Sequence, residues 1–271
     1  FILNWKKGKI VFFVGNEHKN ILEKLNFIKK NKVEFVVSQF PQMQANWLYE
    51  FTNATIISLP HALNKKKFFP KKDFYSRTID VGNRSYLYPL YLGDTFRNDT
   101  LKFSKELSKF FKVDVSTDPS RRFTASEWCE FLNNCKYTIS SEAGSQYLER
   151  DDKTRKIINK FEKINDYESI NKYFSNYKAI NQYSGKLISA RHFEAIGTKT
   201  CQILVQGNYS GILEPNKHYI ELKKDFSNKE EIIDTIRSDK NQHDIVEEAY
   251  EHIIKHHQYS NRITKLLKTI T

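Results

Sequence analysis

Short apolar runs that alternate with amphipathic segments constrain the fold of this chain more than any other feature. Residues 9–14, 33–37 and 54–59 are apolar and rich in β-branched or aromatic side chains, which predicts buried strands. Residues 20–30 lie between the first two runs and carry apolar side chains at helical spacing. Alternation of this kind, with short turns, is typical of an α/β domain with a mostly parallel sheet.

The same alternation resumes after a charged, proline-containing segment at residues 64–72, which is the best candidate for a linker. Strands are then predicted at 79–82, 112–115, 137–140, 201–205 and 219–222, and helices at 99–111, 126–135, 189–197, 229–237 and 243–270. Three strands are too few for an independent domain of this type. We therefore predict a truncated N-terminal domain plus linker at 1–72, and a complete domain at 73–271 with a helical insertion at about 146–186.

The composition supports a folded and basic protein. Of the 271 residues, 39% are hydrophobic, which is enough to bury a core. The net charge of +12 suits a phosphate-bearing partner, namely nucleic acid, anionic lipid or a nucleotide-activated substrate, or else forms only a solvated surface. The three cysteines form no C-x-x-C pair, which disfavours a zinc site or a disulfide framework. No apolar run approaches the ~20 residues that span a bilayer.

Two groups of candidate ligand-binding residues follow predicted strands. Gly82 would let a phosphate approach the backbone, and Arg84 would pair with that phosphate through its guanidinium. An ordinary turn is the alternative. Further along the chain, Glu142 would accept hydrogen bonds from sugar hydroxyls, while Gly144 and Ser145 leave space for a ligand. The structural alternative for Ser145 is a cap on a following helix.

The strongest group opens the predicted helix at 189–197. Arg191 supplies a cation where the helix N-terminus already attracts anions, and Glu194 would accept the ribose hydroxyls of a nucleotide. His192 stands between them, as a general acid, a donor-binding group or a structural histidine. Asp151 follows Glu142 closely enough to act as a base or nucleophile, or it starts a solvated helix. His61 follows Pro60 and is a candidate for the acceptor side.

Residues 191–197, followed by 203–207, 209–211 and 214–215, resemble the C-terminal region of family-1-type glycosyltransferases of the GT-B fold. Those enzymes carry an F-E-A element, a glycine, a strand and a loop rich in glycine and proline before a terminal helix. The resemblance covers roughly residues 78–270 and implies Rossmann-like, doubly wound parallel sheets. It also implies that Glu142 contacts the transferred sugar and Glu194 the ribose, although about fifty residues separate the two here.

The function implied by this resemblance is sugar transfer from a UDP-, GDP- or CMP-linked donor to an acceptor glycan, in bacterial surface polysaccharide such as O-antigen, lipopolysaccharide or capsule. The absence of a D-x-D motif predicts an enzyme without a metal or other cofactor, in which Arg84 and Arg191 neutralise the leaving phosphate. A cytoplasmic location, a lipid-linked acceptor and peripheral contact with an anionic membrane are expected. A basic nucleic-acid-binding module lacks a supporting motif, so no nucleic acid is expected. A non-catalytic fragment that binds sugar nucleotides is a further alternative.

Overall fold

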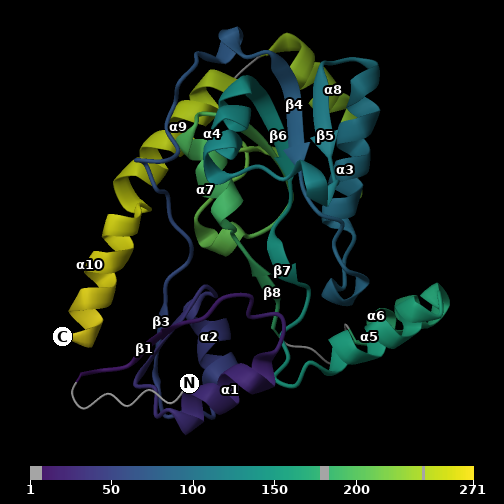
Figure 1. Ribbon diagram of the computed structural model, residues 1–271. Coiled ribbons are helices and arrows are strands. Elements are labelled where there is room, and N and C mark those ends of the chain that lie inside the picture. Colours follow the sequence, from purple (N-terminus) through teal and green to yellow (C-terminus); the bar gives the residue numbers. More distant parts are fainter. Residues whose placement is uncertain (1–7, 178–182, 240–241) are drawn as a thin grey trace.

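The computed structural model describes residues 8–177, 183–239 and 242–271 of the protein. Residues 1–7 of the predicted first domain and 178–182 of the predicted insertion lie outside the described residues. The chain forms two parallel sheets, one above the other in Figure 1, and a short antiparallel ribbon runs between them. The α/β class with parallel sheets, predicted from the alternating pattern, is confirmed.

The smaller sheet has the order β1-β2-β3 and is entirely parallel. Its strands are β1 Val11–Phe13, β2 Phe35–Ser38 and β3 Thr55–Ser58, joined by the helices α1 Ile21–Lys30 and α2 Gln42–Tyr49. We call these five elements the first unit. The three strands and α1 each lie within the corresponding segment predicted from the sequence or overlap it, because their apolar side chains pack on the two faces of the small sheet.

The larger sheet has the order β10-β9-β6-β4-β5 and is also parallel. Its strands are β4 Ile79–Arg84, β5 Val113–Ser116, β6 Cys135–Ser140, β9 Cys201–Val205 and β10 Ile220–Leu222. The helices packed on it are α3 Phe96–Glu106, α4 Ala125–Asn134, α7 Ala190–Gly197, α8 Lys229–Ser238 and α9 Gln242–His256. We call these elements the second unit. Short 3₁₀ turns complete it, at Phe74–Ser76, Leu90–Leu92, Leu107–Lys109, Pro119–Arg121 and Tyr209–Gly211.

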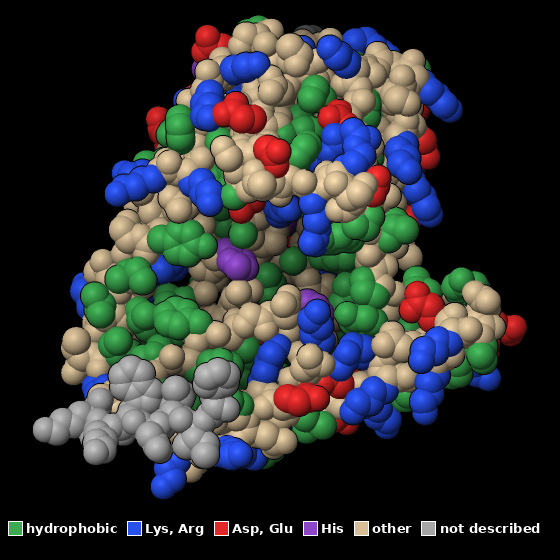
Figure 2. Space-filling model, viewed as in Figure 1, with side chains coloured by type: hydrophobic (Ala, Val, Ile, Leu, Met, Phe, Trp, Pro, Cys, Tyr) green, Lys and Arg blue, Asp and Glu red, His purple; other side chains and the backbone are tan. Residues whose placement is uncertain are grey.

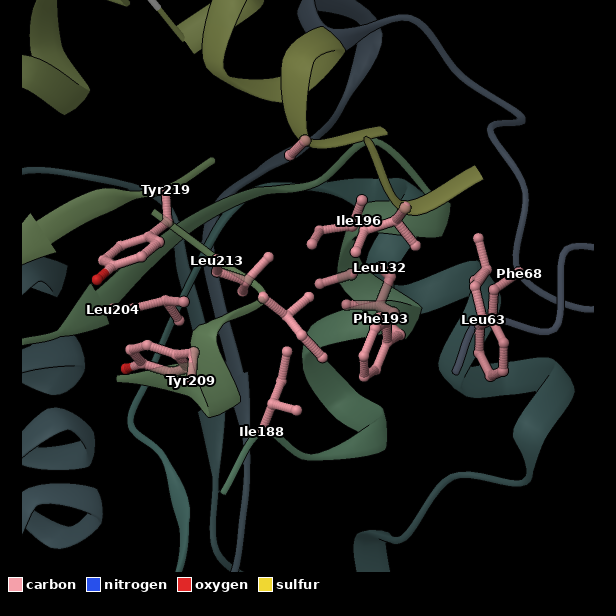
Figure 3. Packing of buried hydrophobic residues seen from close by; sticks show 14 of the residues in the cluster. Leu63, Phe68, Leu132, Ile188, Phe193, Ile196, Leu204, Tyr209, Leu213 and Tyr219 are labelled. Carbon is pink, nitrogen blue, oxygen red and sulfur yellow. The ribbon is translucent and has the colours of Figure 1, made fainter. Parts of the chain in front are cut away.

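The helices cover both faces of the larger sheet, because its central strands carry buried side chains on both sides. In β9, Ile203 faces the cluster that includes α3 and α8, whereas Leu204 faces the cluster that includes α4 and α7. Figure 3 shows the cluster that includes α4 and α7, in which Leu63, just before the predicted linker, and Phe68, within it, pack with Phe193 and Ile196 of α7. This segment is therefore docked on the second unit, although its lysines at 65–67 are exposed.

The strand order creates a topological switch between β4 and β6. The connection after β4 runs through α3 on one face, and the connection after β6 leads to α7 on the other. The two loops separate at this point, which is where doubly wound folds bind ligands.

Gly82 lies inside β4, which continues to Arg84, two residues beyond the predicted strand 79–82, so the turn predicted at this glycine is not formed. A Cβ atom at this position would overlap Cys135 Sγ and would lie 2.7 Å from Phe131 Cζ. The glycine is therefore required by close packing of α4 and β6 against β4, a use of strand glycine that the sequence alone does not distinguish from a phosphate-binding turn.

The predicted insertion contains two helices and is enclosed by two strands that the sequence did not predict. The helices are α5 Lys153–Lys163 and α6 Tyr167–Tyr177, and the strands are β7 Ala143–Ser145 and β8 Gly185–Leu187, paired antiparallel. Gly144 has φ +84 and lies against the Gly185 carbonyl, so a side chain has no room there. Ser145 lies in β7 and caps no helix; its hydroxyl donates to the Tyr147 carbonyl at 2.5 Å.

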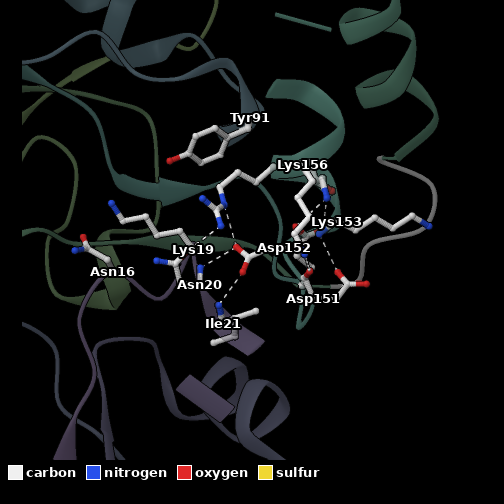
Figure 4. A network of polar contacts seen from close by, with 12 residues as sticks. Asn16, Lys19, Asn20, Ile21, Tyr91, Asp151, Asp152, Lys153 and Lys156 are labelled. Atoms are coloured by element: carbon white, nitrogen blue, oxygen red, sulfur yellow. Dashed lines mark hydrogen bonds and ion pairs between the residues drawn. The ribbon is translucent and has the colours of Figure 1, made fainter. Parts of the chain in front are cut away.

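A buried carboxylate fastens this insertion to the first unit (Figure 4). Asp152 accepts hydrogen bonds from the backbone N–H groups of Asn20 and Ile21, at the start of α1, both at 2.9 Å. Arg155 Nε donates to the same carboxylate at 3.1 Å. Asp152 therefore satisfies two amides that α1 leaves unpaired at its first turn.

The C-terminal segment is broken into two helices, α9 and α10 Tyr259–Ile270, where the sequence predicted helix throughout 243–270. The helix α10 returns to the first unit, where Leu266 packs with Val37, Ile57 and Leu59. Arg262 Nε donates to the Pro60 carbonyl at 3.1 Å. The two units are thus joined by α10 as well as by the linker and the insertion.

Histidine rings gather at the break between α9 and α10. The His218 and His252 rings stack with centroids 4.6 Å apart, and the His257 ring lies 5.0 Å from that of His252. Burial lowers the pKa of all three, that of His257 to about 4, with Arg262 as a further cause at His257. These rings are therefore neutral at pH 7 in the folded protein.

Acidification is expected to destabilise the fold as the pH falls from 6.5 toward 4. The unfolded chain protonates these histidines near 6.5, but the folded chain protonates them only at lower pH. The stabilisation is present above pH 6.5 and is lost progressively as the pH falls toward the lowered pKa of each ring, which is about 4 for His257. Urea denaturation at several pH values across this range measures the effect. In His257→Gln, the free energy of unfolding should decrease less steeply as the pH falls. An equal slope in the variant would contradict the assignment.

Candidate active site

A pocket of about 450 Å³ opens at the switch point of the larger sheet. Its walls are residues 82–86 at the end of β4, 116–118 after β5, 138–141 at the end of β6, and the first turn of α7. Carboxyl ends of parallel strands lie on one edge of a sheet, so residues that are far apart in the sequence meet here. We call this the arginine pocket.

The lining is strongly cationic. Of the described lining residues, five are arginines, namely Arg84, Arg97, Arg121, Arg122 and Arg191. Asp118 is the one acidic residue among them. Burial lowers the pKa of Arg97, and it lowers that of Arg191 despite the nearby Glu194. A pocket of this charge and size is suited to a ligand that bears phosphate groups.

The side chain of Arg84 is 9% accessible to solvent, against 56% for that of Arg191. Its Nη2 donates to Asp114 at 2.7 Å, while Nε and Nη1 are buried without a hydrogen-bond partner. The guanidinium lies against the rings of both Phe123 and Phe131, 5.1 Å from each centroid, and these two rings also contact each other with centroids 5.2 Å apart. Unpaired donors on a buried cation are costly, so the geometry favours an anion that completes them.

Two further buried donors line the same pocket without partners. His192 is fully buried and accepts a hydrogen bond at Nδ1 from the Ser189 backbone N–H, at 3.0 Å. Nε2 therefore carries the proton, and neither it nor Gln202 Nε2 has a hydrogen-bond partner. Burial, followed by the charge of Arg97, lowers the pKa of His192 to about 3. His192 thus lies in the pocket as a neutral hydrogen-bond donor.

Arg191 and Glu194 meet around a tryptophan. The guanidinium of Arg191 stacks over the Trp128 ring, 4.0 Å from its centroid, and Trp128 Nε1 donates to Glu194 Oε2 at 2.7 Å. Arg191 and Trp128 line the arginine pocket, whereas Glu194 lines neither this pocket nor the one between the two units. Burial raises the pKa of Glu194, and Arg191 opposes that shift.

A second pocket of about 660 Å³ adjoins the first and lies between the two units. Ser141 lines both. The lining of the second pocket is mostly polar and includes Gln44, Glu142, Gln146, Ser184, Lys186, Gln206, Asn208 and Lys224. We call it the inter-unit pocket.

The carboxylate of Glu142 anchors the loop that follows β9. Its Oε1 accepts a hydrogen bond from the Tyr209 backbone N–H at 2.7 Å, and a Cβ atom at Gly207 would lie 2.5 Å from Oε2. Burial raises the pKa of Glu142. The structure thus brings Glu142 to the edge that holds Arg84 and Arg191, in the adjoining pocket.

Asp151 and His61 line neither of these pockets. Asp151 is exposed at the start of α5, where its Oδ1 accepts from the Lys153 backbone N–H at 3.1 Å. The His61 carbonyl accepts from Arg262 Nη2 at 3.3 Å, and burial lowers the pKa of the His61 ring. In the part of the chain that the structure describes, no group of three or more His, Cys, Asp or Glu side chains is placed to hold a metal ion.

A protein-family model described as "Glycosyl transferase-like" matches residues 121–268. This match covers more than half of the 271 residues, including β6, α7 and β9. The chain belongs to the glycosyl transferase-like family. No curated protein matches it in sequence.

Solved structures identify the fold of this glycosyl transferase-like chain as GT-B. It resembles TarM with a TM-score of 0.54 and 14% identity, covering 99% of this chain and 51% of TarM. A sucrose-phosphate synthase from Thermosynechococcus elongatus gives 0.52 and 9%, covering 94% of this chain and 64% of the other. The GtfA/B complex gives 0.51 and 12%, covering 97% and 53%. The chain thus spans between half and two thirds of these relatives.

Three of the residues that line the arginine pocket of this glycosyl transferase-like chain were not predicted from the sequence, namely Arg97, Arg121 and Arg122. Arg121 and Arg122 follow β5, so the rule that selected Arg84 after a neighbouring strand would have found them. Arg97 comes from the first turn of α3, and no sequence signal separates it from an ordinary surface arginine. In the described helices, no segment is both long and apolar enough to cross a membrane.

Proposed function

We propose that this chain binds a nucleotide sugar in the arginine pocket and transfers the sugar to an acceptor glycan. The observation that carries the proposal is Arg84, a buried cation with two unpaired N–H donors at the switch point of the sheet. Phosphate oxygens are the acceptors that match a guanidinium fork. His192 and Gln202 would donate to the same ligand.

In the proposed reaction the arginines hold the diphosphate as it departs. Breaking the bond between sugar and phosphate leaves negative charge on the phosphate, and preorganised cations stabilise that charge in the transition state. Five arginines against one carboxylate in the lining support a reaction without a metal ion. His192 would act as a donor and not as a general acid, because its pKa of about 3 keeps it neutral.

The sugar and the acceptor would occupy the inter-unit pocket. Its amide, hydroxyl and lysine side chains suit the hydroxyl groups of a glycan, and it adjoins the arginine pocket at Ser141. Glu142 would address the sugar, and Glu194 would act on the ribose through Trp128, whose indole N–H it holds. A bacterial surface polysaccharide, built on a lipid carrier at the cytoplasmic side, is the acceptor we propose.

Thermal unfolding with a panel of nucleotides and nucleotide sugars tests the donor assignment. A ligand at a hundred times its Kd is expected to add about 2.7 kcal/mol to the free energy of unfolding. We expect UDP-, GDP- or CMP-linked compounds to stabilise the chain equally with and without EDTA. Stabilisation that needs magnesium or manganese would overturn the metal-free reaction, and no stabilisation by any nucleotide would overturn the donor site. Nucleotide binding without transfer to any glycan would indicate the non-catalytic alternative.

A further inference from the structure

The helix α5 carries a row of lysines on one face. Its exposed lysines are Lys153, Lys156, Lys160 and Lys163. Their spacing of three, four and three residues places them along one side of the helix. The buried residues Thr154 and Ile158 lie on the opposite side. None of these exposed lysines forms an ion pair with a carboxylate among the residues that the structure describes, and the ammonium group of Lys156 donates a long hydrogen bond, 3.4 Å, to the backbone carbonyl of Asp151.

The turn between α5 and α6 adds an apolar tip to this row. Ile164 is 70% exposed and Tyr167 is 53% exposed, on either side of the left-handed turn at Asn165. Figure 1 shows the α5–α6 hairpin projecting from the body of the protein, and Figure 2 shows Lys and Arg side chains gathered over its lower surface. Exposing large apolar side chains to water is unfavourable. Such side chains beside clustered lysines, at the end of a projection, therefore indicate a surface that binds a partner.

The hairpin is fixed to the rest of the protein. Asp152 ties its first turn to α1, and the Thr154 hydroxyl lies 2.9 Å from the Tyr173 hydroxyl, between the two helices. Ile158 and Ile170 are buried. The lysine row and the tip are therefore presented in one orientation, and little further ordering is needed when they bind.

We propose that the lysine face of α5 and the Ile164–Tyr167 tip bind the surface of an anionic lipid bilayer. Lysines near such a surface are attracted by about 1 kcal/mol each, which corresponds to about a fivefold gain in affinity. Ile164 supplies a buried aliphatic group at the headgroup boundary, and Tyr167 is an amphipathic ring of the kind that lies there. Ile164 has no stacking face, which leaves Tyr167 as the one ring of the tip, whereas single-stranded nucleic acid is bound by successive stacking rings; the tip therefore favours a bilayer over a nucleic acid strand.

Vesicle co-sedimentation tests the proposal without any need for enzyme activity. We expect the chain to bind vesicles of equal parts phosphatidylglycerol and phosphatidylcholine, and to bind pure phosphatidylcholine vesicles far less. The triple variant K156Q/K160Q/K163Q should lose on the order of a hundredfold in affinity, from three lysines at about fivefold each. The variant I164S/Y167S should also weaken binding, and its deficit should persist in high salt.

The matched control is K105Q/K109Q/K112Q, which removes the same charge from exposed lysines of the second unit. The control variant should bind anionic vesicles as tightly as the unchanged protein does. All variants should have the melting temperature of the unchanged protein. Equal losses in the control and the α5 variant would show attraction by net charge alone and would overturn the proposal. It would also be overturned if the chain bound a single-stranded oligonucleotide through these lysines but did not bind anionic vesicles.

Discussion

Arg84→Met should weaken the binding of a nucleoside diphosphate at least a hundredfold while leaving the fold intact. A hydrogen bond to a charged group contributes about 1.5–3 kcal/mol, and Arg84 has two buried donors for a ligand. A loss of about 3 kcal/mol corresponds to two factors of ten in Kd. Asp114, the present partner of Arg84, is 34% exposed and can be hydrated when the guanidinium is removed. Calorimetric titration with UDP and GDP measures the loss.

Two further variants distinguish the effect of the planar guanidinium geometry from the effect of positive charge alone. Arg84→Lys keeps the positive charge but not the planar fork, so affinity should still fall. Arg237→Met removes a charge of the same kind from an exposed pair with Asp234 and should have no effect. Unchanged affinity in Arg84→Met would show that the phosphate binds elsewhere.

Arg77→Met should destabilise the protein by about 3–5 kcal/mol. Arg77 is 5% exposed and sits among backbone carbonyls at the base of the larger sheet. It donates to the carbonyls of Thr198 at 2.7 Å and Cys135 at 2.9 Å, and to the Thr200 hydroxyl at 3.0 Å. Without the guanidinium, these buried acceptors lose their donor. Each acceptor then remains buried without a hydrogen bond, and its desolvation is no longer compensated.

Chemical denaturation of Arg77→Met, followed by circular dichroism, checks this second prediction. Arg77→Lys should recover only part of the loss, because an ammonium group cannot reach acceptors on α4, β6 and the loop after α7 together. The midpoint should move with little change in slope if the native contacts alone are lost. A variant as stable as the unchanged protein would mean that water replaces the guanidinium.

Strands with continuous apolar sequence could be located from the sequence. Residues 201–205 match β9 at both ends, because every residue of the run is buried and a glycine follows soon after. β7 and β8 could not be located, since three residues each, with glycine in both, carry neither length nor alternation. The break between α9 and α10 has no proline or glycine and depends on packing against the first unit.

The candidate site was only partly accessible from the sequence. Arg84, Arg191 and His192 line one pocket because they follow strands or open a helix on the same edge of the sheet. Their roles required coordinates: the neutrality of His192 depends on its burial and on the Ser189 N–H, and the partner of Glu194 is a tryptophan 66 residues away. Arg97 projects from a helix whose pattern does not mark it.

The cores of the two units are not separable by a single cut in the chain. Leu148 and Leu187, which flank the α5–α6 insertion, complete the core around α1 and α2, and Leu266 of α10 closes the other face of the small sheet. Recombining this protein with a relative by a junction near residue 72 would therefore place all three leucines against a foreign surface. A chimera that keeps these contacts would need to carry the insertion and α10 together with the first unit, although the three segments are discontinuous in the sequence.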